Sequence, residues 1–123
     1  MAIRVRHNGP VAVVEVQGDV TFGSGALGRP LNLKGEAVDD VGATIGRLLD
    51  DERAMILLDM HSVRFIDSAG IGEMVAFKKR AVERGGDVKL LNPSERVRQL
   101  IEIVRLNEIF EIFDDEESGV GSF

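Results

Sequence analysis

The chain has 123 residues, of which 44% are hydrophobic and 29% charged, and this size and composition suit one globular domain with a single core. The formal net charge of −6 argues against nucleic-acid binding, which depends on Lys and Arg, and the absence of cysteine excludes disulfides and thiolate metal sites. No apolar stretch reaches the roughly 20 residues needed to cross a bilayer, and no secretory signal is evident, so we expect a cytoplasmic protein without membrane insertion.

The first predicted element is a β-hairpin. Residues 3–7 alternate between apolar and polar side chains, which is the period of a strand with one wet face. Gly9 and Pro10 then favour a turn, and residues 11–16 predict a second, antiparallel strand.

The glycines and the proline of residues 22–35 predict an inserted loop after the hairpin. Loops of this length are often functional, but a tolerated surface insertion explains the segment equally well.

The remaining predicted elements alternate between helix and strand. They are, in chain order, a helix over 38–49, an internal strand over 54–60, a helix over 68–84, a strand over 88–91, a helix over 93–104 and a short strand over 110–113. Residues 114–123 predict an acidic tail that frays. The alternation implies parallel pairing, so the predicted class is α/β, in one domain over 1–123: a mixed, mostly parallel sheet with an antiparallel N-terminal hairpin and helices packed on it.

The junction before the helix over 68–84 carries the most informative residues. Asp67, Ser68, Gly70 and Gly72 place a carboxylate, a hydroxyl and two glycines at a helix N-terminus. In a purely structural interpretation, Asp67 or Ser68 caps the helix, and the two glycines permit close packing against the sheet. In a regulatory interpretation, Ser68 accepts a phosphate beside the positive helix N-terminus, and the added charge releases a partner without unfolding the protein.

A resemblance to a known family favours the regulatory interpretation. Residues 63–72, with the sequence VRFIDSAGIG, resemble the signature of STAS domains of the anti-sigma factor antagonist group. The likeness continues downstream over 85–93 and 97–113, and upstream over 11–18. It implies a non-enzymatic protein without a cofactor or metal of its own. Such a protein binds an anti-sigma factor that is also an ATP-dependent serine kinase, is released by phosphorylation, and is restored by a serine phosphatase, which regulates sigma-factor-dependent transcription.

The resemblance also implies which residues carry this function. Ser68 matches the phosphorylated serine, and Asp67 would help to orient it or its kinase. The predicted partner-binding residues are Thr21, Arg64, Asp67, Ser68, Ala69, Gly70, Ile71 and Gly72. Thr21 stands where family members commonly have an acidic residue, and the loop over 22–35 is longer than expected. That loop leaves the sheet at the same end as Ser68, where it could touch the partner or cover the serine.

Other functions have less support in the sequence. A STAS adaptor or scaffold subunit of a larger assembly, stressosome-like or in lipid transport, would use Ser68 only as a helix cap. A hydrolase is disfavoured, because Ser68 has neither a nucleophile elbow nor an evident base partner. His7 and His61 lie far apart in the sequence, and we interpret both as surface or junction residues rather than as metal ligands.

Overall fold

A computed structural model describes residues 2–20, 41–51 and 54–123 of the chain. It contains a five-stranded sheet in which the spatial order of the strands follows their order in the chain. The strands are β1 (Ala2–Asn8), β2 (Val11–Val20), β3 (Met55–Ile66), β4 (Asp87–Leu91) and β5 (Ile112–Phe113). Strands β1 and β2 pair antiparallel, and every later pair is parallel, which confirms the predicted α/β class and mixed sheet.

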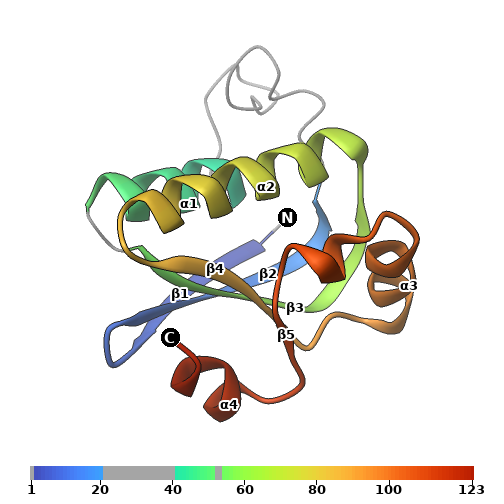
Figure 1. The fold of residues 1–123 in the computed structure, drawn as a ribbon. Coiled ribbons are helices and arrows are strands. Elements are labelled where there is room, and N and C mark those ends of the chain that lie inside the picture. Colours follow the sequence, from blue (N-terminus) through green and yellow to red (C-terminus); the bar gives the residue numbers. More distant parts are fainter. Residues whose placement is uncertain (1, 21–40, 52–53) are drawn as a thin grey trace.

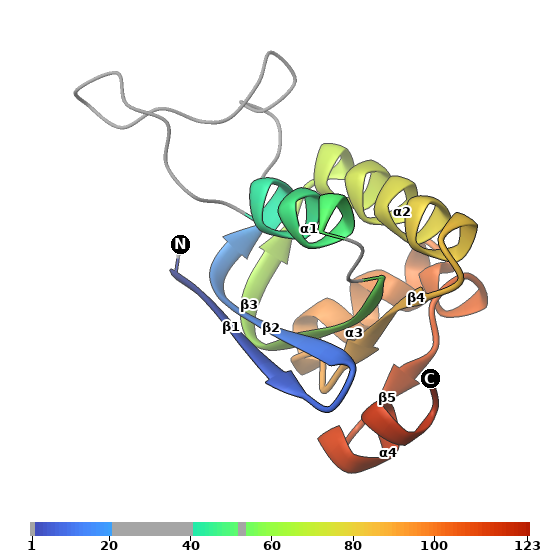
Figure 2. The ribbon, with the colours of Figure 1, turned by 90° about the vertical axis from the view of Figure 1, so that its left-hand side faces the viewer.

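Helices cover the two faces of the sheet unequally (Figures 1 and 2). They are α1 (Val41–Asp50), α2 (Ser68–Glu83), α3 (Glu95–Ile103), the 3-10 helix η2 (Leu106–Glu108) and α4 (Glu116–Gly121). Helices α1 and α2 pack on one face, over the larger cluster of buried apolar side chains. Helix α4 lies on the opposite face, over a smaller cluster that includes Val11, Val13, Leu57 and Leu91. Strand β3 therefore has apolar cover on both faces, as its nearly continuous apolar run predicts.

Strand β3 is longer than the apolar run from which it was predicted. It pairs with β4 only from Met55 to Asp59, whereas its pairing with β2 continues to Ile66 across two register shifts. Along the second half of β3, where β4 no longer pairs with it, helix α3 lies beside the strand instead. The hydroxyl of Ser94, the N-cap of α3, donates to the Val63 carbonyl at 2.8 Å. The final strand is shorter than predicted, because the N–H of Phe110 donates to the Leu106 carbonyl and closes a turn there.

The prediction of a fraying acidic tail over 114–123 is wrong, because this segment packs on the sheet. Asp115 caps α4 by accepting a hydrogen bond from the N–H of Ser118 at 2.9 Å. Gly119 is buried against Leu57, and a Cβ at this position would lie only 2.9 Å from the Leu57 Cδ2 atom. The ammonium group of Lys89 donates to the carbonyl and the hydroxyl of Ser122, both at 2.9 Å. Contacts with the sheet, rather than helix propensity, hold this short glycine-containing helix.

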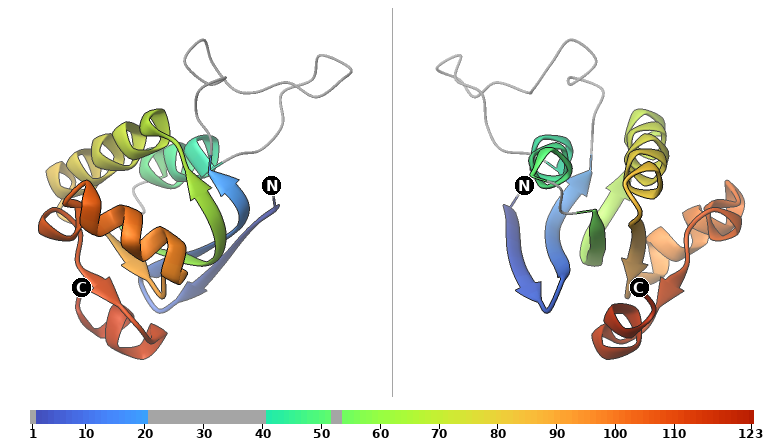
Figure 3. Two further views of the ribbon diagram at one scale, coloured as in Figure 1. Left: turned by 90° about the vertical axis from the view of Figure 1, so that its right-hand side faces the viewer. Right: turned by 60° about the vertical axis from the view of Figure 1, so that its left-hand side comes forward.

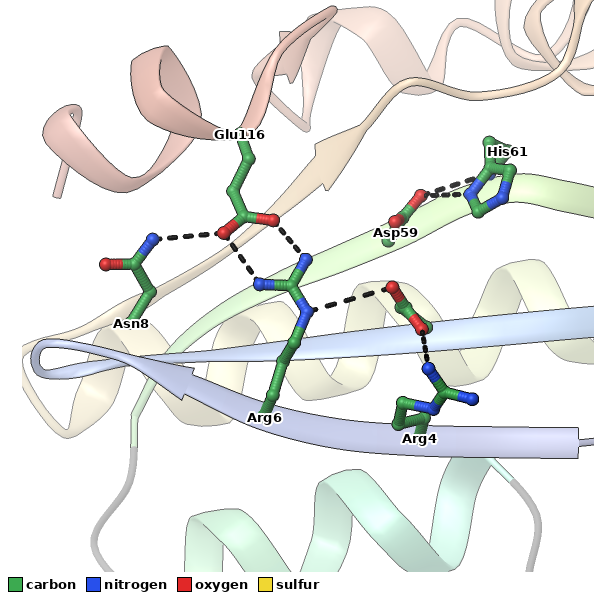
Figure 4. Close-up of polar contacts among 7 residues, drawn as sticks. Arg4, Arg6, Asn8, Asp59, His61 and Glu116 are labelled. Atoms are coloured by element: carbon green, nitrogen blue, oxygen red, sulfur yellow. Dashed lines mark hydrogen bonds and ion pairs between the residues drawn. The ribbon is translucent and has the colours of Figure 1, made fainter.

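An ion pair joins the first strand to the last helix (Figure 4). The guanidinium of Arg6 donates to both carboxylate oxygens of Glu116, 110 residues away, with an Nη1–Oε2 distance of 2.7 Å. Asn8 donates to the same carboxylate at 3.0 Å. The hydrogen bonds from Arg6 hold the pKa of Glu116 at about 2, and the same contact raises the pKa of Arg6. The bidentate geometry fixes how α4 lies across the sheet.

We predict that Glu116→Gln lowers the free energy of unfolding by about 1 kcal/mol at pH 7. The folded-state pKa of about 2 lies below the ordinary value of 4.5, so the ion pair stabilises the fold above pH 4.5 and loses its effect as the pH falls toward 2. Urea unfolding at pH 7 and pH 3 measures this difference. Asp114→Asn is the control, because that carboxylate is 82% exposed in its pair with Arg98. A difference of equal size at both pH values would contradict a role of the Glu116 charge.

Candidate functional site

The junction over residues 67–72 that the sequence singles out lies where β3 ends and α2 begins. Strands β2 and β3 are parallel, and their last residues, Val20 and Ile66, are paired, so both strands end at the same edge of the sheet. Figure 3 shows these two ends side by side below the start of α2. Ile66 is buried in the larger core cluster, and Asp67 continues the chain in an extended conformation with φ −83° and ψ 171°. The helix then begins at Ser68, so its N-terminus is positioned directly by the sheet.

Asp67 is the N-cap of α2. Its Oδ1 atom accepts a hydrogen bond from the N–H of Gly70 at 2.6 Å, and its carbonyl accepts from the N–H of Ile71 at 3.0 Å. The sequence left open whether Asp67 or Ser68 performs this function, and the geometry assigns it to Asp67. A half-buried carboxylate on a helix N-terminus satisfies orphan N–H groups and interacts favourably with the helix dipole.

Ser68 is therefore the first helical residue, and its side chain is exposed. The first turn of α2 contains no acidic residue. A second negative group placed on Ser68 would stand at the positive end of a helix that is 16 residues long. The site thus combines an accessible hydroxyl with a local field that tolerates an anion.

Phe65 is an exposed aromatic residue that the sequence analysis missed. Half of its surface, 50%, is accessible, although phenylalanine usually belongs to the core. It is paired with Asp19 of β2, whereas the next pair, Val20 and Ile66, includes a residue of the larger core cluster. Successive strand residues point to opposite faces, so Phe65 cannot share the face of Ile66. No local pattern in the sequence indicates this exposure, because the two exposed residues Arg64 and Phe65 lie between Val63 and Ile66, which are both buried in the larger core cluster.

The other predicted site residues fall into different environments. Arg64 and Gly72 are exposed, Gly70 is buried, and Ile71 is half-buried against the larger core cluster. The suggestion that both glycines permit close packing is wrong for Gly72, because a Cβ there would meet nothing within 4 Å. Ala69 lies in the first turn of α2. Thr21 and the loop over 22–35 lie outside the described residues.

The two histidines occupy exposed positions, as the sequence analysis expected. His61 places its Nδ1 atom 2.9 Å from Oδ1 of the buried Asp59 (Figure 4). Within residues 2–20, 41–51 and 54–123, no group of three or more acidic or histidine side chains is arranged to hold a metal. The helices in these ranges also lack the length and apolar content needed to span a bilayer.

Comparison with known proteins identifies the family. The model of the STAS domain family matches residues 2–119. This chain is a STAS domain. The resemblance carried by residues 63–72 is thereby confirmed at the level of the family, and these residues span the end of β3 and the start of α2.

Several relatives of this STAS domain are anti-sigma factor antagonists. The anti-sigma-B factor antagonist of Bacillus subtilis is 35% identical over 72 residues, which is 58% of this chain and 66% of that protein. The match therefore spans slightly less than two thirds of the relative. An anti-sigma factor antagonist of Mycobacterium paratuberculosis has the same fold, with a TM-score of 0.76 at 16% identity over 98% of this chain and 92% of that one.

A third similar protein is the antagonist SpoIIAA, whose structure is known in two forms. The unphosphorylated form has a TM-score of 0.64 at 16% identity and covers 98% of this chain and 96% of its own. The phosphorylated form, from Bacillus, has a TM-score of 0.66 at 17% identity and covers 98% of each chain. At this level of identity the likeness establishes a shared fold.

We predict that Asp67→Ala lowers the free energy of unfolding by about 1 kcal/mol, because it removes the cap of α2. Asp67→Ser should lose less, since a serine hydroxyl can accept the same hydrogen bond from the N–H of Gly70. Urea unfolding followed by circular dichroism measures both variants. Equal losses for alanine and serine would show that Asp67 stabilises the fold in some way other than capping.

Proposed function

We propose that this STAS domain is an anti-sigma factor antagonist that is switched by phosphorylation of Ser68. The observation that carries the proposal is the division of tasks at the junction: Asp67 caps α2, which leaves the exposed hydroxyl of Ser68 available for chemistry. The Bacillus subtilis relative supports the antagonist role. The neighbour SpoIIAA supports the switch, since it exists in phosphorylated and unphosphorylated forms.

The proposed cycle consists of two phosphoryl transfers at one oxygen. In the first, the Oγ atom of Ser68 loses its proton and bonds to the γ-phosphorus of ATP, and the bond to the ADP leaving group breaks. In the second, water attacks the phosphoserine, the bond between Oγ and phosphorus breaks, and inorganic phosphate leaves. The partners supply the catalysis: an anti-sigma factor that is a serine kinase performs the first step and a serine phosphatase the second. This chain supplies the acceptor and its position.

The position of Ser68 explains how a phosphate would act as a switch. It adds a charge of roughly −1.5 to −2 at the first residue of α2, where the helix dipole tolerates an anion and the fold survives. On the docking surface formed by Arg64, Ser68 and Gly72, the same charge would have to be desolvated against the partner. Binding is therefore lost while the domain stays folded, and the released anti-sigma factor can again capture its sigma factor.

The adaptor role is the alternative that the experiment must separate from the switch. In an adaptor, Ser68 would serve as a helix cap and would not need to be accessible. The cap is Asp67, and Ser68 is exposed, which favours the switch. A phosphate-independent place in a large assembly would favour the adaptor instead.

We predict that Ser68→Asp weakens binding to the anti-sigma factor kinase by at least tenfold, whereas Ser68→Ala binds as the unmodified chain does and cannot be switched. Isothermal titration with the purified kinase measures both. Ser68→Asn is the matched control, because it has nearly the shape of Asp without the charge and should bind within a fewfold of the wild type. The melting temperatures of all three variants should stay within a few degrees of the wild type, which excludes unfolding as the cause.

Mass spectrometry of the protein from its native cells provides the second half of this test. Phosphopeptide mapping in several growth states should find phosphate on Ser68 in some states, with the kinase co-purifying mainly in the others. Ser68 without phosphate in every state, within an assembly of constant composition, would contradict the switch and support the adaptor.

A further inference from the structure

Exposed apolar side chains gather at one corner of the domain, where α3 ends and η2 follows. Ile103 is 78% exposed, and Val104 and Ile109 are exposed as well. These are three of the six large apolar residues that are exposed in the described part of the chain. The corner is firmly anchored, because Leu106 and Phe110 of the same segment are buried in the larger core cluster. A fixed cluster of exposed apolar side chains is typical of a surface that binds another protein.

Arg105, in the middle of this corner, has a backbone conformation that favours glycine over arginine. Its φ of 60° and ψ of 30° lie in the left-handed region. Backbone hydrogen bonds hold the turn on both sides: the N–H of Arg105 donates to the Glu102 carbonyl at 3.2 Å, and its carbonyl accepts from the N–H of Glu108 at 3.1 Å. Within the described ranges, no hydrogen bond or ion pair involves its exposed side chain. The guanidinium therefore adds no such contact to this part of the domain and is available to another molecule.

An open hollow of about 520 Å³ lies beside the corner, lined by Lys78 of α2 and by residues 107–113. That segment contributes four apolar side chains and two exposed glutamates, Glu108 and Glu111. The ammonium of Lys78 is already engaged, 2.6 Å from the Asp87 carboxylate. Glu108, in contrast, has no ion pair in the part of the chain that the structure describes. The hollow is therefore apolar and carries an uncompensated negative charge.

We propose that a second copy of this chain docks at this corner, so that the domain forms a two-fold symmetric dimer. Each copy offers a ridge, formed by Ile103, Val104 and Arg105, and next to it the hollow. A two-fold axis brings the ridge of each copy into the hollow of the other, so that the same contact is made twice. Ile103 and Val104 then bury their exposed surface against the apolar wall of the hollow, and Arg105 pairs with Glu108 of the other copy.

The charges of the corner favour a second copy over a different protein. The ridge carries the unpaired positive charge of Arg105, and the hollow carries the unpaired negative charge of Glu108. One surface of this chain is thus complementary to itself, whereas a different partner would have to supply both an acidic hollow and a basic apolar ridge.

This docking surface is distinct from the proposed phosphorylation site. Lys78, at the wall of the hollow, lies ten residues after Ser68 in α2, which corresponds to about 15 Å along the helix axis. The inference therefore goes beyond the proposed function and does not depend on it.

The first test measures self-association and its dependence on the ridge. Sedimentation velocity of the full chain over about 10–500 µM should show a reversible equilibrium between monomer and dimer. Ile103→Ser should raise the dimer dissociation constant at least tenfold, because the apolar side chain that fills the hollow is lost. Val5→Ser is the matched control, since Val5 is also an exposed aliphatic residue but lies on β1, at the opposite edge of the sheet. It should leave the dissociation constant within twofold of the wild type.

Charge reversal then tests the pairing of Arg105 with Glu108. Arg105→Glu and Glu108→Arg should each weaken self-association at least tenfold, because like charges meet twice in the symmetric dimer. An equimolar mixture of the two variants should form a heterodimer, since both contacts then join opposite charges. The double variant R105E/E108R should dimerise with itself. Melting curves by circular dichroism within a few degrees of the wild type would exclude unfolding as the cause of any loss.

The opposing outcomes are equally specific. A wild-type domain that stays monomeric at the highest concentration would overturn the inference. A dimer that Ile103→Ser and Val5→Ser weaken equally would also overturn it, and so would charge-reversed variants that fail to associate when mixed, because the contact would not then join the ridge to the hollow. None of these results bears on phosphorylation of Ser68, so the failure of this inference is distinguishable from the failure of the proposed function.

Discussion

Burial of strand β3 on both faces is the constraint on which the rest of the domain depends. Ile56 and Leu58 face the core under α1 and α2, and Leu57 between them faces the cluster under α4. A strand covered on two sides cannot shift by one residue without exchanging its two sets of side chains, so its register is strongly specified. The carboxyl end of β3 is therefore fixed in space. The start of α2, and with it Ser68, takes its position from that end.

At this junction the sequence separates the residue that builds the structure from the residue that would be modified. The carboxylate of Asp67 satisfies the N–H of Gly70 and begins the helix. Had Ser68 been the cap, modification of its hydroxyl would have removed a hydrogen bond from the helix terminus, and the switch would have cost stability. With Asp67 as the cap, the neighbouring hydroxyl can gain or lose a phosphate while the helix terminus keeps its hydrogen bond. Under the proposed function, this arrangement accounts for the two polar residues at the junction.

The elements defined by local patterns could be predicted, and those defined by distant contacts could not. The alternation over 3–7, the apolar run of β3 and the cap before α2 are local signals, and the structure contains the elements that they predict. Helix α4 has no comparable signal. Its glycines and acidic residues indicate a fraying tail, and contacts with residues distant in the sequence, such as that of Glu116 with Arg6 110 residues away, hold it as a packed helix. The accessibility of Phe65 and the open space at Gly72 likewise depend on which face of each element meets the core.

The anchoring of α2 determines how a charge on Ser68 can be detected. Met74, Phe77 and Ala81 are buried along the helix, and the Lys78 ammonium lies 2.6 Å from the Asp87 carboxylate of β4. The close approach of Gly86 to Ala54 fixes the chain just beyond the other end of the helix. A charge at the first residue changes none of these contacts, and the dipole of the helix opposes any fraying there. Because the helix is held along its whole length, a phosphate on Ser68 would not change the fold of the rest of the domain. Under the proposed function, a partner would therefore have to detect the phosphate by direct contact at the start of α2.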